Sequence, residues 1–155
     1  MNKTDNNVHK KFVFFMHSQY FEGILQLRNS GQEVEDFVLD RIDNRKNVTI
    51  AKVLKQKNGY DYYLSSQKFL QILGKQLQQK FGGELKVSTK LHTRNRVTSK
   101  EVHRVTVLFR PPKFKKGDIV RYRGEDLLII NCGTKVYCKN VKSNKKMSIP
   151  YERFN

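Results

Sequence analysis

The chain has 155 residues, which fits one ordinary domain or two small ones, and its 31 Lys and Arg against 14 Asp and Glu give a formal net charge of +17. A charge this large favours an anionic partner, either nucleic acid or an acidic membrane surface, whereas the 37% hydrophobic content argues against a wholly disordered basic tail. The apolar runs are too short to span a bilayer, no signal peptide is recognisable, and two cysteines are too few for a disulfide framework, so we expect a soluble, cytoplasmic protein.

Residues 1–10 are polar, lack periodicity, and are predicted to form a disordered N-terminus. Tyr20 to Arg28 alternates between apolar and polar side chains, which is typical of a half-buried strand. Ser30 and Glu33 have the spacing of a capping box and predict that a helix begins there. The apolar stripe of this helix consists of Val34, Phe37, Val38 and Ile42.

Asn58-Gly59 lies between two strand-like runs, Val48 to Gln56 and Tyr60 to Leu64. It predicts a tight hairpin in which both turn residues adopt positive φ. Ser65 or Ser66 can cap a second helix, which Gly82-Gly83 ends. The apolar stripe of this second helix consists of Phe69, Leu70, Leu73, Leu77 and Phe81.

Two further strands are predicted at Glu84 to Leu91 and Val102 to Phe109, joined by a basic loop from Thr93 to Glu101. Alternation predicts that their apolar side chains face the core, namely Leu85, Val87, Leu91, Val105, Val107 and Phe109. The opposite face then carries Lys86, Ser88, Lys90, Arg104, Thr106 and Arg110. If the strands pair as a hairpin, this face forms a basic strip.

Pro111-Pro112 is the clearest boundary, because neither proline can donate to a sheet ladder. Beyond it, four short strands are predicted at Ile119 to Arg123, Leu127 to Asn131, Lys135 to Asn140 and Met147 to Pro150. The sequence therefore predicts an α+β fold, a β-α-β-β-α-β-β open sandwich over residues 11–111, followed by a small SH3-like all-β barrel over residues 112–155.

Charge is concentrated between Lys86 and Arg123, where twelve residues are basic and only Glu101 and Asp118 are acidic. This run predicts a track that neutralises phosphates, and RNA is favoured because neither a helix-turn-helix nor a zinc finger is recognisable. The candidate RNA-binding residues are Lys86, Lys90, Arg94, Arg96, Lys100, Arg104, Arg110, Lys113, Lys115, Lys116, Arg121 and Arg123. Base stacking is a further candidate role of three tyrosines, Tyr60, Tyr62 and Tyr63, although alternation places at least one of them in the core.

His92 and His103 flank the basic loop and are the pair that an RNA nuclease would use as general acid and base. The sequence places no carboxylate to orient either histidine, so we expect no enzymatic activity. Cys132 and Cys138 lack the spacing of a zinc knuckle and are interpreted as small buried hydrophobic residues. We predict neither a metal site nor a cofactor.

Four motifs follow one another in a recognisable order. The strand Tyr20 to Arg28 carries the first, at Tyr20, Glu22, Gln26 and Arg28, and the segment Asn58 to Ser66 carries the second, at Gly59, Asp61 and Tyr62. The segments Glu101 to Val107 and Phe114 to Val120 supply the others. Together they resemble the NMD-three family, in its archaeal branch, over residues 18 to 154. We interpret the glycine and the aromatic residues as specifying the fold, and Arg28 as the candidate functional residue among them.

The resemblance implies a factor of the large ribosomal subunit. Eukaryotic members are adapters for nuclear export of this subunit and extend toward the tRNA exit site and the L1 stalk. For an archaeal member, the resemblance implies subunit maturation or prevention of premature subunit joining. Members begin with paired CxxC zinc modules, which are missing here, so we expect a fragment or a reduced protein, with a separate chain as a candidate source of the zinc module.

The expected function is therefore that of a non-catalytic, monomeric factor that binds large-subunit rRNA, with the L1 stalk as a candidate second contact. Two alternatives stay open, namely a general RNA- or tRNA-binding protein without ribosome specificity and an RNA nuclease. A membrane-surface role is not expected, because neither predicted helix has a basic face opposite a large aromatic one.

Overall fold

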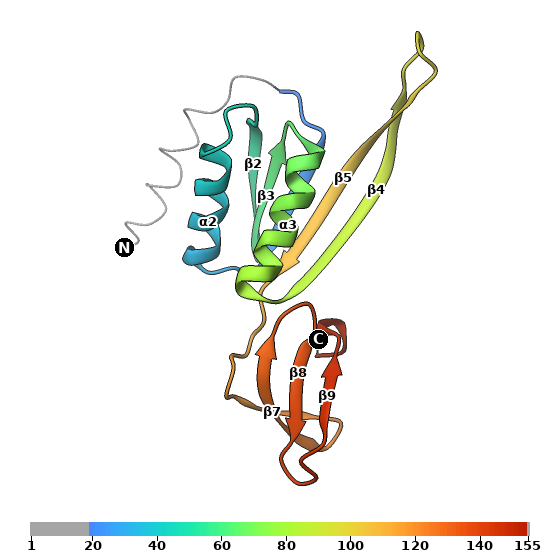
Figure 1. Ribbon diagram of the computed structural model, residues 1–155. Helices are drawn as coiled ribbons and strands as arrows, with labels where there is room; N and C mark the ends of the chain where they lie inside the picture. The colour runs from blue at the N-terminus through green and yellow to red at the C-terminus, as the bar shows by residue number, and fades with distance from the viewer. Residues whose placement is uncertain (1–18, 155) are drawn as a thin grey trace.

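The computed structural model describes residues 19–154, which form two β-sheets joined by a short linker (Figure 1). The disorder predicted for residues 1–10 lies outside the described residues. The N-terminal sheet and its helices comprise β1 (Gly23–Arg28), α2 (Gln32–Asp43), β2 (Ile50–Gln56), β3 (Gly59–Leu64), α3 (Gln67–Phe81), β4 (Glu84–Arg94) and β5 (Glu101–Arg110). The C-terminal sheet comprises β6 (Ile119–Tyr122), β7 (Glu125–Cys132), β8 (Val136–Asn140) and β9 (Lys146–Ile149), and the short 3-10 helix η1 (Tyr151–Phe154) follows it.

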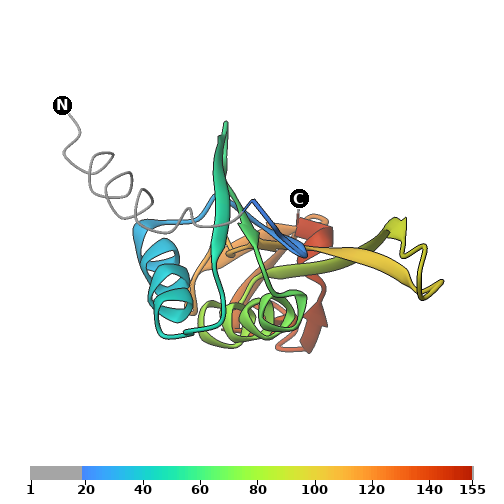
Figure 2. The same cartoon turned by 90° about the horizontal axis from the view of Figure 1, so that it is seen from above.

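The N-terminal sheet has the strand order β2-β3-β1-β5-β4, with β1 at its centre. β1 pairs antiparallel with β3 and parallel with β5. Both helices lie on one face of this sheet, and the other face carries no described helix (Figure 2). The core therefore lies between the helices and the inward side chains of the three central strands, among them Leu25, Leu27, Tyr62, Leu64, Val105, Val107 and Phe109. The predicted α+β class is confirmed.

The first helix starts differently from the prediction. Gly31 is the N-cap of α2, and it supplies no side-chain cap. The Ser30 hydroxyl instead donates to Glu35 Oε1 at 3.3 Å. The predicted capping box of Ser30 and Glu33 was therefore wrong, because the helix begins too late for Ser30 to reach its free amides. Most of the predicted apolar stripe is buried, namely Val34, Val38 and Ile42.

The β2–β3 hairpin turns one residue earlier than predicted. Gln56 pairs with Gly59, so Lys57 and Asn58 occupy the turn, and Asn58 does not adopt positive φ. The prediction of positive φ at both Asn58 and Gly59 was therefore wrong. Gly59 itself has a φ of +148°, and a β-carbon there would overlap the carbonyl of Leu27 on β1. Glycine is required because two backbones approach closely at this end of the sheet.

The second helix begins and ends as predicted. Ser66 is the N-cap of α3, and its hydroxyl accepts a hydrogen bond from the Phe69 amide at 3.3 Å. Gly82 ends the helix with a φ of +67°, a left-handed conformation that favours glycine. A β-carbon at Gly82 would also overlap the carbonyl of Cys132 on β7. The end of α3 therefore packs directly against the C-terminal sheet.

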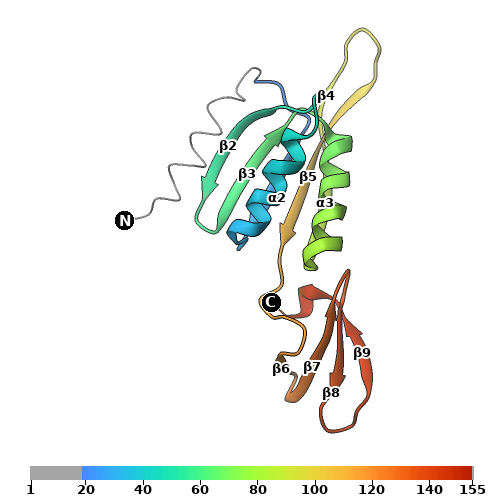
Figure 3. The same ribbon diagram turned by 60° about the vertical axis from the view of Figure 1, so that its left-hand side comes forward.

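β4 and β5 continue past the rest of the N-terminal sheet as a projecting two-stranded arm, residues 89–104 (Figures 1 and 3). Leu85, at the start of β4, lies close to Gly74 of α3, but Val87 and Leu91 are about half exposed. The prediction that Val87 and Leu91 belong to the core was wrong. β4 is the edge strand, and it runs out of the layer that α3 covers.

The C-terminal sheet is a four-stranded antiparallel meander in the order β6-β7-β8-β9. The predicted strands are present, but within the described residues its edges β6 and β9 do not pair, so the predicted closed SH3-like barrel is not observed. Each edge strand has only four residues. The apolar face is instead covered by Phe114, whose ring stacks on Tyr151 at 6.4 Å, and by Phe154.

The two sheets meet through specific contacts. Besides Gly82 against Cys132, the Lys86 ammonium lies 3.4 Å from the Glu152 carboxylate of η1. Tyr151 is buried at this junction, where burial raises the pKa of its hydroxyl to about 12 and the hydroxyl donates to the Gly133 carbonyl at 3.0 Å. Within residues 19–154, neither helix has the length and apolar character needed to cross a membrane.

Candidate nucleic-acid interface

Three of the candidate RNA-binding residues lie together on the open face of the N-terminal sheet, opposite the helices. Val105, Val107 and Phe109 of β5 are buried toward the helices, so the residues between them point the other way. Lys90 pairs with Arg104 in the ladder, and Lys86 pairs with Leu108. Alternation therefore places Lys86, Lys90 and Arg104 on this open face, as predicted.

A buried acid changes the role of two predicted sites, Lys86 and Arg110. Glu84, only 6% exposed, accepts a hydrogen bond from Arg110 Nη1 at 2.9 Å and lies 2.9 Å from Lys86 Nζ. The hydrogen bond to Glu84, and to a smaller extent that to Glu152, raises the pKa of Lys86. We call these four residues, Glu84, Lys86, Arg110 and Glu152, the Glu84 cluster. Sequence reasoning missed it because Glu84 lies just before the basic run and Glu152 lies far from it in the chain.

Arg94 ends β4, and Arg96 and Lys100 lie in the loop between β4 and β5. This tip of the arm lies far from the C-terminal sheet (Figure 1). All three are exposed. The strand register shifts between Leu91 and Thr93, so Arg94 pairs with Glu101, and this pair points to the opposite face from Lys90 and Arg104. The arm therefore presents cations on both of its faces, which the simple alternation of the sequence did not predict.

The remaining candidates lie below the arm, in the linker and on the C-terminal sheet. Lys113, Lys115 and Lys116 are exposed in the linker between β5 and β6. Arg121 pairs with Asp126 across the β6–β7 ladder, and Arg123 occupies the following turn with a φ of +50°. The structure thus divides the twelve predicted residues into an arm group, a partly neutralised junction and a C-terminal group, rather than one continuous strip.

An aromatic and cationic cluster on the open face was not predicted. The ring of Phe21 packs edge-on against Tyr63 at 4.8 Å, and the Arg104 guanidinium lies over Phe21 at 3.9 Å. Lys52 Nζ lies 4.2 Å from the Tyr63 ring centroid. The signal was available, because alternation puts Tyr63 on the face opposite Tyr62. Tyr62 is fully buried, and burial raises the pKa of its hydroxyl.

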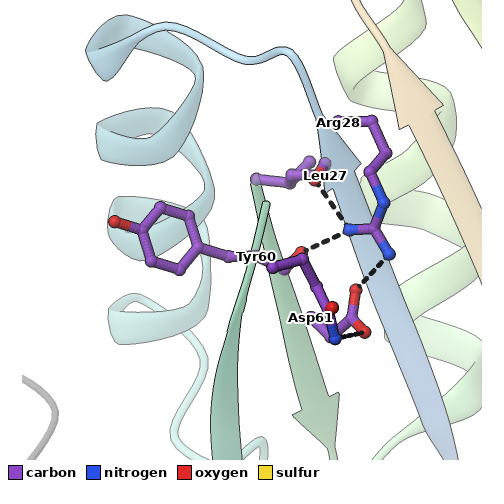
Figure 4. A network of polar contacts seen from close by, with 5 residues as sticks. Leu27, Arg28, Tyr60 and Asp61 are labelled. Carbon is purple, nitrogen blue, oxygen red and sulfur yellow. Dashed lines mark hydrogen bonds and ion pairs between the residues drawn. The ribbon is translucent and has the colours of Figure 1, made fainter. Parts of the chain in front are cut away.

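Arg28, the candidate functional residue of the first motif, is engaged within the fold (Figure 4). Its guanidinium lies 2.6 Å from the Asp61 carboxylate and donates to the carbonyls of Leu27 and Tyr60 at 2.9 and 3.3 Å. Asp61 is buried and also accepts from Gln56 at 3.0 Å. The arrangement joins β1, β2 and β3 at one end of the sheet, so Arg28 and Asp61 act in the fold.

The two histidines of the nuclease alternative are not brought together as a pair. Leu91, rather than His92, pairs with His103, and His92 lies in the bulge. His103 Nε2 does lie 3.3 Å from Glu101 Oε2, an orienting contact that the sequence analysis did not predict. Across residues 19–154, no group of three or more His, Cys, Asp and Glu side chains is arranged to hold a metal ion.

The fold and these groups define a strongly basic α+β protein whose cations extend along a projecting hairpin. Residues 20–110, from the start of the first motif to the end of β5, match the family model described as NMD3, second domain. This is more than half of the chain, and the chain belongs to the NMD3 family. The comparison with curated proteins gave no match.

Proposed function

We propose that this protein is a non-catalytic factor that binds the large ribosomal subunit through rRNA phosphates. Membership of the NMD3 family supports a ribosome-associated role at that subunit. The main support for the rRNA contact is the charge of the arm, in which Glu101 is the single acidic residue. The arm has five cationic residues, namely Lys90, Arg94, Arg96, Lys100 and Arg104. Contacts of this kind release counterions from the phosphates, so the affinity depends on salt and little on sequence.

The finer role follows the family. We propose that the protein acts in maturation of the subunit or prevents its premature joining, near the tRNA exit site and the L1 stalk. In this proposal it works as a cytoplasmic monomer of archaeal type, with residues 11–111 and 112–155 as its two domains. A separate chain would supply the zinc module of the family.

Sedimentation of the protein with separated ribosomal subunits across a salt series tests this function. The decisive variant changes Arg94, Arg96 and Lys100 to Glu. A matched control changes Lys142, Lys145 and Lys146, three exposed lysines in the β8–β9 turn and at the start of β9, to Glu, with the same change in net charge. We expect the wild type to be retained on the large subunit at moderate salt. The arm variant should lose this retention, and the control should keep it.

The salt dependence adds a second measure. Removing three phosphate contacts should reduce the slope of log K against log salt by about 2–3. If the arm variant and the control lost retention on the large subunit equally, the binding would depend on the overall positive charge and not on the arm. Equal binding to both subunits, free tRNA and random duplex would instead favour a general RNA-binding protein without ribosome specificity.

A further inference from the structure

A groove of about 570 Å³ lies beside the arm, where β5 extends beyond its pairing with β1. Gly23, the first residue of β1, pairs with Val105, so residues 101–104 of β5 pair with no strand on that side within residues 19–154. The Val105 amide donates to the carbonyl of Glu22, the residue just before β1, at 3.2 Å. The walls of the groove come from residues 20–22, the first turns of α3 and the arm itself.

The acids of this groove are bonded within the protein. Glu22 accepts from the Tyr20 hydroxyl through Oε1 and from the Gln67 amide at the start of α3 through Oε2, both at 3.0 Å. Glu101 lies against His103. Lys100 and Arg104, by contrast, form no ion pair with an acid of residues 19–154. The groove therefore offers cations to a ligand while its carboxylates are occupied.

Two flat groups are held at the walls of the groove. Tyr20 is 59% exposed, and its hydroxyl bond to Glu22 restricts how the ring turns. The Arg104 guanidinium is held by its stacking on Phe21. Aromatic rings and guanidinium planes are the groups on which proteins stack unpaired bases of RNA. Among polyanions, only one with exposed aromatic bases uses both the charge and the flat surfaces.

The loop that closes the groove at the tip of the arm is also held in place. The Asn95 side-chain oxygen accepts from the amides of Val97 and Thr98 at 2.9 and 3.0 Å, and the Asn95 amide donates to the Lys100 carbonyl at 2.8 Å. Arg94 Nε donates to the Ser99 carbonyl at 3.0 Å. Ordering this loop on binding therefore needs little further loss of conformational entropy.

We propose that this groove binds a single-stranded segment of RNA, with one base stacked on Tyr20 and phosphates beside Arg104 and Lys100. The inference rests on the proposed function, since its natural ligand is then an unpaired stretch of rRNA. Duplex RNA is a poor fit, because its bases are already stacked on one another.

Fluorescence anisotropy with a short labelled oligoadenylate tests the groove. Tyr20→Ala should weaken binding about tenfold, a modest value for the loss of one base–aromatic stack, while Tyr20→Phe keeps the ring and should bind nearly as well as the wild type. Tyr137→Ala is the matched control, because Tyr137 is an exposed tyrosine on the C-terminal sheet, at 43%. Lys100→Ala should lower the salt slope by about 0.7, and Tyr20→Ala should leave that slope unchanged.

Three results would overturn the inference. The first is an unchanged affinity of Tyr20→Ala for oligoadenylate, and the second is an equal loss for an RNA duplex of similar length. The third is displacement of oligoadenylate by an oligoglutamate peptide at comparable charge, which would make the groove a site for acidic peptides. If the wild type still sediments with the large subunit in these cases, the proposed function stands and only the groove assignment fails.

Discussion

Replacing Glu84 with alanine should destabilise the protein and, at the same time, strengthen its binding to polyanions. Glu84 is buried at the junction of the two sheets and holds the guanidinium of Arg110 and the ammonium of Lys86. Without the carboxylate, Arg110 keeps its charge but loses its buried partner, while Lys86 keeps only its contact with Glu152.

The size of the stability loss follows from the Arg110 contact. A hydrogen bond to a charged group contributes about 1.5–3 kcal/mol. Glu84 is 6% exposed, but the Arg110 side chain is 30% exposed and recovers part of its hydration in the variant. We therefore expect Glu84→Ala to lower the free energy of unfolding by about 2 kcal/mol, and Glu84→Gln by less, because the amide oxygen still accepts a hydrogen bond. Urea denaturation followed by far-UV circular dichroism measures both values.

Glu152→Ala is the control for the junction. It removes only the 3.4 Å contact between two exposed side chains, Lys86 and Glu152, and should leave the urea midpoint nearly unchanged. An unchanged midpoint for Glu84→Ala would refute the reasoning, since the buried carboxylate would then contribute nothing to the fold.

The same variant has a second readout in RNA binding. If Lys86 and Arg110 become available to phosphates, each new contact should steepen the salt slope for oligoadenylate binding by about 0.7. A destabilised Glu84→Ala protein with the wild-type slope would show that the Glu84 cluster supports the fold but does not limit the charge offered to RNA.

Gly59→Ala should lower the free energy of unfolding, measured in urea, by about 2–4 kcal/mol. The reason is that φ is +148° and the β-carbon would overlap the Leu27 carbonyl. A decrease no larger than that of an ordinary surface substitution, within about 0.5 kcal/mol, would contradict this. Gly82→Ala should destabilise the protein more than Gly124→Ala. Both glycines have positive φ, but only the β-carbon at Gly82 would contact the backbone of β7. Equal decreases in the free energy of unfolding would mean that the close approach of α3 to β7 does not affect stability. Glu35→Gln should stabilise the protein at neutral pH, because burial raises the pKa of Glu35 and its charged form is disfavoured in the fold. This gain should grow as the pH rises from the ordinary pKa to the raised one and stay constant above it. It should vanish below the ordinary value, where the carboxyl is protonated in both states, and a gain independent of pH would argue against the burial cause.

Local patterns were enough for the order of elements and for much of the core. The stripe of α3 and its two ends follow from helical spacing, a serine cap and paired glycines, all of which depend on residues within a few positions of one another. Alternation along β4 and β5 likewise predicted which face carries Lys86, Lys90 and Arg104, because the side-chain period of a strand is a local property.

Chain order alone did not reveal the neighbours of these elements. Val87 and Leu91 have the alternation of core residues, yet no element of the described part covers them, and only the sheet order shows that β4 is an edge strand. The charge count treated Lys86 and Arg110 as free, because their partner Glu84 is buried by contacts between two sheets.

The groove beside the arm shows the same division. The sequence by itself determined the elements, the excess of positive charge and the residues available for binding, since these depend on composition and local periodicity. Only the tertiary structure decided which cations form ion pairs and that Tyr20 and Arg104 line the same groove. Both relations arise between segments far apart in the chain. The pairing of β4 with β5 and the contact with η1 set the ion pairs, and the parallel pairing of β1 with β5 brings residues 20–22 beside the arm.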